Sequence, residues 1–104
     1  MKVFTLNDAI KKQSKDREFK EFYDRELLIN VIAKMAVERR QAVSLTQSEL
    51  AKRAGTTQSV IARLESGTDK RIPSLDLLAR IASASNTHIN ITFESDSPNR
   101  RTKV

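Results

Sequence analysis

The chain has 104 residues, two glycines, no cysteine and a formal net charge of +6. This length suits one small domain, the lack of cysteine excludes disulfides and thiolate chemistry, and no stretch is apolar for long enough to cross a membrane. The positive charge favours an acidic partner, and nucleic acid, an anionic surface and an acidic protein all remain alternatives.

Residues 1–26 predict a helical extension at the start of the chain. Asn7 can cap a short helix that runs to about Ser14, and a second helical stretch begins near Asp16. Apolar residues recur from there at helical spacing, so a single long or kinked helix to about Arg40 is an alternative. The start of the chain lacks the apolar region of a secretory signal, and we therefore expect a cytoplasmic protein.

The extension also holds four of the five aromatic residues of the chain, with five carboxylates around them. Aromatic side chains rimmed by charge are typical of a protein-binding surface. The alternative is that the aromatic stripe packs on the core of its own small domain. The candidates for partner contact are Phe19, Phe22 and Tyr23.

The middle of the chain predicts two short helices joined by a tight turn. Thr46 and Glu49 have the spacing of a capping box, which opens a helix that ends at Gly55. Thr57 can cap a second helix, which ends at Gly67. The inward-facing residues are expected to be Leu50, Ala51, Ala54, Val60, Ile61 and Leu64.

The last part of the chain predicts a further helix and a strand. Ser74 follows Pro73 and can cap a helix with a leucine-rich face. Residues 88–94, "HINITFE", alternate apolar and polar side chains, which predicts a half-buried β-strand. We expect this strand to be a candidate dimer contact, and residues 95–104 to be a flexible polar tail.

The helix from Gln58 to Ser66 has one face of short polar side chains. Gln58, Ser59, Ala62, Arg63 and Ser66 lie on one side, opposite the apolar residues. A solvated helix face usually carries several Lys and Glu residues, whereas these side chains fit a groove and offer hydrogen bonds at defined angles. Two helices at a steep angle, with such a face on the second, form the helix-turn-helix arrangement that enters the DNA major groove.

The stretch "TQSELAKRAGTTQSVIARLESGTDKRIPSLDLLARIA" resembles the helix-turn-helix of the lambdoid phage repressors and of the larger Cro/repressor (XRE) family. The resemblance covers residues 27–83, within an expected DNA-binding core of residues 27–87. It implies an all-α fold with a five-helix core, to which this chain adds the N-terminal extension and the C-terminal strand. The residues that match the family pattern in spacing are Gln47, Leu50, Ala51, Gly55, Gln58, Ile61, Leu64, Glu65 and Gly67.

This resemblance also implies roles for individual side chains. Thr46 and Gln47 lie at the phosphate-binding start of a helix, where free N–H groups and the helix dipole favour an anion. Lys70 and Arg71 in the following loop are further candidates for phosphate contact. Arg40 and Glu65 match positions that form a salt bridge in the phage repressors; two independent surface charges are the alternative. The candidates for base contact are Thr57, Gln58, Ser59 and Arg63.

The layout of the whole chain is similar to that of HigA-type antitoxins in type II toxin–antitoxin modules. This likeness implies a repressor that binds a palindromic operator in double-stranded DNA as a homodimer. It also implies that the chain neutralises a small basic ribonuclease toxin of the HigB/RelE kind. A stand-alone or phage-type regulator without a toxin partner is the alternative.

Other classes of function have little support in the sequence. The one histidine, His88, has no companion, and we identify no phosphate-binding glycine loop, no metal-ligand set and no catalytic carboxylate pair. RNA binding is possible on charge, but the polar helix face has no aromatic stacking platform. We therefore expect neither an enzyme nor a cofactor.

Overall fold

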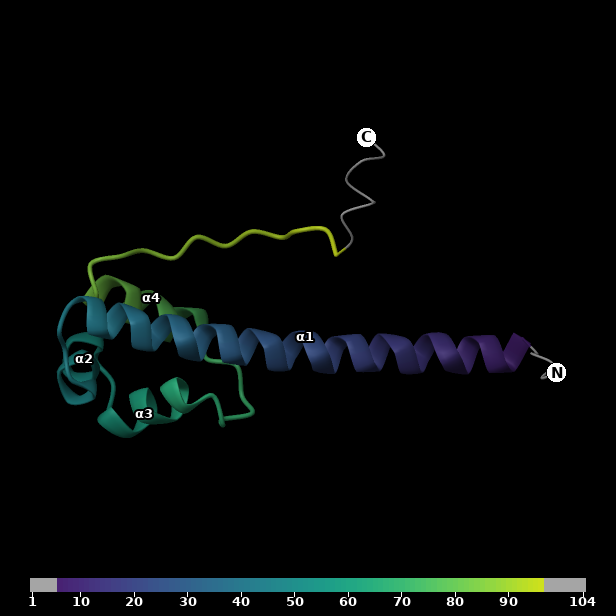
Figure 1. Ribbon diagram of the computed structural model, residues 1–104, viewed down its shortest axis with the longest axis horizontal. Coiled ribbons are helices and arrows are strands. Elements are labelled where there is room, and N and C mark those ends of the chain that lie inside the picture. The colour runs from purple at the N-terminus through teal and green to yellow at the C-terminus, as the bar shows by residue number, and fades with distance from the viewer. Residues whose placement is uncertain (1–5, 97–104) are drawn as a thin grey trace.

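The computed structural model describes residues 6–96, with the side chains of residues 15–96. It has four helices, α1 (Leu6–Ala42), α2 (Gln47–Ala54), α3 (Gln58–Ser66) and α4 (Leu75–Ala84). Figure 1 shows α2, α3 and α4 gathered around the C-terminal part of α1, while the N-terminal part of α1 projects away from them. The molecule therefore has an elongated shape, with extents of 61 × 34 × 21 Å. In residues 6–96, no helix combines the length and the apolar character that a membrane span requires.

The N-terminal extension and the first core helix are one continuous helix. The expectation of a five-helix core with a separate helical extension is wrong, because α1 alone has 37 residues and the described chain has four helices. Residues 6–42 contain neither glycine nor proline, and they are rich in Lys, Glu, Arg and Ala, which favour helix. No residue in this range ends the helix, so it continues through the boundary expected at Ser14.

The C-terminal β-strand expected at residues 88–94 is also absent. This segment runs extended beside the helices, and the described part of the chain has no strand with which it could pair (Figure 1). The alternation of Ile89, Ile91 and Phe93 predicts two different faces but does not supply a neighbouring strand, which a stable sheet requires. Ile91 and Phe93 are exposed as a result. Most of the expected flexible tail, residues 97–104, lies outside the described residues.

The hydrophobic core lies where α1, α2, α3 and α4 meet. Leu50 of α2 and Ile61 of α3 have no solvent-exposed surface. The inward positions predicted for α2 are confirmed, and on α3 Ile61 and Leu64 are buried while Val60 is half-buried. This core fixes α2 and α3 against α1, so the opposite face of α3 points away from the protein. The buried core residues are Ala36, Leu45, Leu50, Ala51, Ala54, Ile61, Leu64 and Ile81.

Candidate nucleic-acid interface

The turn between α2 and α3 is built from local caps that the sequence predicts. The Thr46 hydroxyl accepts from the Glu49 backbone N–H at 3.1 Å, and the Glu49 carboxylate accepts from the Thr46 N–H at 2.9 Å, which completes the capping box. These hydrogen bonds lower the pKa of Glu49, the backbone N–H of Thr46 making the largest contribution. At the start of α3 the Thr57 hydroxyl accepts from the Val60 N–H at 3.3 Å.

The two glycines end α2 and α3 in the left-handed region of backbone conformation. Gly55 has φ 69° and Gly67 has φ 70°. A side chain at such a position costs about 1–2 kcal/mol in backbone strain. A Cβ atom at Gly55 would also lie 3.3 Å from Nη1 of Arg80. Glycine therefore allows α3 to start close behind α2 and sets the angle between them.

Arg80 of α4 holds this turn in place, a role that the sequence analysis missed. Its Nη1 donates to the Ala54 carbonyl at 2.8 Å and to the Gly55 carbonyl at 2.9 Å, at the end of α2. Its Nε donates to Asp76 at 3.1 Å. The sequence indicates the contact between Asp76 and Arg80, because the two residues are four apart on one helix. It does not indicate the hydrogen bonds from Arg80 to the Gly55 and Ala54 carbonyls, which are 25 and 26 residues away.

The polar face of α3 is exposed. Thr57, Gln58, Ser59 and Arg63 are all exposed, while Ile61 on the other side of the helix is fully buried. The structure therefore brings the four candidates for base contact onto one accessible surface at the start and middle of α3. Their donors and acceptors match those needed in the major groove, where Gln pairs with adenine and Arg with guanine.

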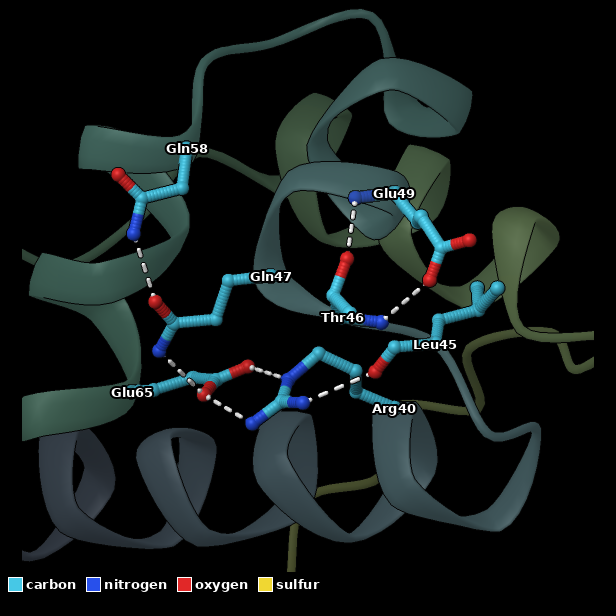
Figure 2. Close-up of polar contacts among 7 residues, drawn as sticks. All are labelled: Arg40, Leu45, Thr46, Gln47, Glu49, Gln58 and Glu65. Carbon is cyan, nitrogen blue, oxygen red and sulfur yellow. Dashed lines mark hydrogen bonds and ion pairs between the residues drawn. The ribbon is translucent and has the colours of Figure 1, made fainter.

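A chain of polar contacts joins this face to α1 (Figure 2). Arg40 of α1 forms an ion pair with Glu65 of α3, with Nε–Oε2 at 2.7 Å and Nη2–Oε1 at 3.0 Å. The Gln47 amide nitrogen donates to Glu65 at 3.0 Å, and the Gln58 amide nitrogen donates to the Gln47 amide oxygen at 2.8 Å. Arg40 also donates to the Leu45 carbonyl at 2.9 Å. Gln58, the first polar residue of the α3 face, is thus linked to α1. The link runs through Gln47 and Glu65 to the Arg40 guanidinium.

The ion pair in this chain is largely removed from solvent. The side chains of Arg40 and Glu65 are 17% and 5% exposed. The hydrogen bond to Glu65 raises the pKa of Arg40 above its ordinary value, so the guanidinium stays charged. The geometry is bidentate, which is the strong form of an arginine–carboxylate contact.

The candidates for phosphate contact lie at two places beside α3. Thr46 and Gln47 are at the N-terminus of α2, where the Thr46 hydroxyl is occupied by its cap and the Gln47 amide by Glu65 and Gln58. Lys70 and Arg71 are exposed in the loop after α3. Lys70 Nζ lies 3.6 Å from Glu26 of α1, and Arg71 Nε lies 3.4 Å from Asp69. The Arg71 backbone N–H and side chain lower the pKa of Asp69, so this carboxylate offsets part of the positive charge of the loop.

The three aromatic candidates for partner contact lie on the projecting part of α1. Phe19, Phe22 and Tyr23 are 70%, 61% and 58% exposed. The alternative that they pack on the core is wrong for this chain, because α1 carries them away from α2, α3 and α4 (Figure 1).

Comparisons with known proteins agree with this geometry. The family model HTH_3, described as helix-turn-helix, matches residues 38–91. Comparison with curated proteins and with solved structures gives no significant match. The match to the family model covers just over half of the 104 residues and includes α2, α3, α4 and the end of α1. The chain belongs to this helix-turn-helix family, and it is a DNA-binding transcription regulator of the XRE type.

Proposed function

We propose that the chain is a sequence-specific repressor that reads its operator with the exposed face of α3. The observation that carries this proposal is a series of hydrogen bonds between side chains. It joins Arg40, Glu65, Gln47 and Gln58 in that order. It fixes the Gln58 amide before DNA arrives, so less side-chain freedom is lost on binding. Gln58 and Arg63 recognise bases, and Thr57 and Ser59 add shorter contacts to the same groove.

The phosphate contacts surround this face and set its register. The DNA backbone is contacted from two places beside the α3 face. One is the start of α2, with Thr46 and Gln47, and the other is the loop after α3, with Lys70 and Arg71. Such contacts give affinity and orientation but little sequence preference. The repressor binds as a homodimer to a palindromic operator, with half-sites about 34 Å apart.

Lys70→Ala tests the assignment of the loop to the backbone. We expect this variant to bind all duplexes more weakly by the same factor, because the lysine contacts phosphate and not bases. The slope of log affinity against log salt concentration should fall by about one unit. Fluorescence anisotropy at several salt concentrations measures both effects. Lys34→Ala removes the same charge from the exposed surface of α1 and should leave the slope unchanged; equal slopes for the two variants would contradict the assignment.

We further propose that the projecting part of α1 binds a small basic ribonuclease toxin, which makes the chain an antitoxin that represses its own operon. The support is the exposure of Phe19, Phe22 and Tyr23 together with the carboxylates around them. Large exposed aromatic residues of this kind provide the anchors of protein interfaces. A regulator without a toxin is the alternative. The two are distinguished by whether the adjacent reading frame encodes a small basic protein that binds this chain.

The double variant Phe19→Ala/Tyr23→Ala tests the toxin surface. Co-expressed with the small basic protein from the adjacent reading frame, it should bind that protein at least tenfold more weakly, while its affinity for DNA stays the same. Leu75→Ala is a matched control, because Leu75 is 62% exposed but lies on α4. If the adjacent protein does not bind the unchanged chain, the alternative of a stand-alone regulator holds.

A further inference from the structure

An open apolar groove lies between α1 and α4, away from the DNA-reading face. Its volume is about 320 Å³, and its lining includes Ile32, Met35, Ile81 and Ile89. Arg39 lies in the same lining, and its Nε is buried without a hydrogen-bond partner in the described part of the chain. A buried donor of this kind carries a free-energy cost until it is satisfied. The mainly apolar lining of the groove suits an apolar occupant.

The chain that follows α4 starts in this groove and then leaves it. Ser85 is fully buried, its carbonyl accepts from Arg39 Nη2 at 2.9 Å, and Thr87 donates to the Ala82 carbonyl at 3.0 Å. From this fixed base residues 88–96, here called the C-terminal arm, run extended toward the projecting part of α1 (Figure 1). Asp96 at the far end of the arm lies 3.1 Å from Lys20.

Two apolar side chains of the arm are exposed on the described part of the molecule. Ile91 is 59% exposed and Phe93 is fully exposed. The arm leads Phe93 away from the groove, although the groove has the apolar character that this ring requires. Exposed apolar groups and an open apolar groove on the same molecule favour an exchange between two copies, since a two-fold axis makes each contact twice.

The sequence of the arm is self-complementary about Ile91. When two arms run antiparallel with Ile91 opposite Ile91, Ile89 of one lies opposite Phe93 of the other. In the same register His88 lies opposite Glu94, an imidazole opposite a carboxylate, and Asn90 lies opposite Thr92. Apolar residues meet apolar residues and polar residues meet polar residues at every position. Pairs of this kind stabilise extended segments that lie side by side.

We propose that the groove between α1 and α4 is filled by Phe93 of a second copy, with the two arms crossing antiparallel at Ile91. The two observations converge, because Ile89 and His88 both line the groove. The register places Phe93 of the second copy beside Ile89, in the apolar part. It places Glu94 of the second copy opposite His88, whose side chain is exposed. This arrangement rests on the homodimer of the proposed function and names its interface.

Single cysteines in this cysteine-free chain test the crossing point. In Ile91→Cys the two introduced residues face each other about 4.5–5.5 Å apart, within the range of a disulfide. In Thr92→Cys they lie about 7–8 Å apart, beyond that range. Under mild oxidation, non-reducing electrophoresis should therefore show Ile91→Cys converted to a covalent dimer at least tenfold faster than Thr92→Cys. Equal rates, or faster reaction of Thr92→Cys, would overturn the register.

Two further variants test the occupant of the groove. Phe93→Ala should weaken dimerisation at least tenfold in sedimentation equilibrium, while Leu75→Ala, which removes an exposed leucine from α4, should not. In Met35→Cys/Phe93→Cys, a disulfide between two chains supports the exchange, and a disulfide within one chain overturns it by showing that the arm folds back on its own groove. A chain that stays monomeric overturns both the exchange and the homodimer. A stable dimer with no effect of Phe93→Ala overturns only the exchange.

Discussion

Glu65→Ala is expected to lower the free energy of unfolding by about 3 kcal/mol or more. The substitution leaves the Arg40 guanidinium, 17% exposed, without the carboxylate that accepts its two hydrogen bonds at 2.7 and 3.0 Å. A charge left unpaired in such a place costs far more than the pair itself contributes. Chemical denaturation followed by circular dichroism measures the change.

The control for this prediction replaces both partners. Arg40→Met/Glu65→Leu removes the pair without leaving a charge behind, and it should recover most of the stability lost in Glu65→Ala. A loss of less than about 1 kcal/mol in Glu65→Ala would mean that the pair behaves like an exposed surface salt bridge. The position of Gln47 is affected as well, because its amide donates to Glu65 at 3.0 Å. The double variant should therefore bind DNA more weakly than the unchanged chain, even though it recovers most of the stability.

Arg63→Ala is expected to weaken binding to the preferred operator by about 10- to 100-fold. A bidentate contact between arginine and guanine contributes about 1–3 kcal/mol of discrimination, and 1.4 kcal/mol corresponds to a factor of ten. Arg63 is exposed on the α3 face, so the substitution leaves the core unchanged. Affinities for the operator and for a scrambled duplex should therefore approach each other, because most of the loss falls on the specific sequence.

The matched control for this second prediction is Arg53→Ala. It removes the same charged group from the exposed surface of α2, outside the face assigned to base contact. We expect a small and sequence-independent loss of affinity. If Arg63→Ala and Arg53→Ala reduce binding to every duplex alike, Arg63 acts only through its charge and does not read a base.

Features that depend on a few neighbouring residues could be predicted from the sequence. The capping box of Thr46 and Glu49 and the left-handed glycines at Gly55 and Gly67 are local devices, and each is present where the sequence placed it. The buried face of α2 follows from helical spacing in the same way. These local signals fix the turn and therefore the exposure of the α3 face.

Features that depend on distant partners could not be predicted in this way. Arg80 reaches the end of α2 across 25 residues, and Gln58 meets Gln47 across 11. No pattern in the sequence specifies these pairs. The strand expected at residues 88–94 failed for a related reason, since an alternating pattern describes one segment while a sheet needs two.

The exposure of the aromatic residues on α1 could not be predicted, because it depends on the length of the helix. The apolar stripe around Phe19 and Tyr23 was compatible with packing on the core or with exposure. The decision depends on how far α1 continues, and without a helix-breaking residue it extends past the reach of the other helices. The aromatic residues are consequently exposed.

The central claim is that the α3 face distinguishes base pairs, and selection from a random duplex library tests it most directly. The unchanged chain should enrich an inverted repeat with half-sites about one helical turn apart. Repeated with Arg63→Ala and with Gln58→Ala, the selection should lose preference at one position in each half-site and keep the others. If the unchanged chain enriches no sequence, or if both variants enrich the same sequence with equal strength, the face does not read DNA.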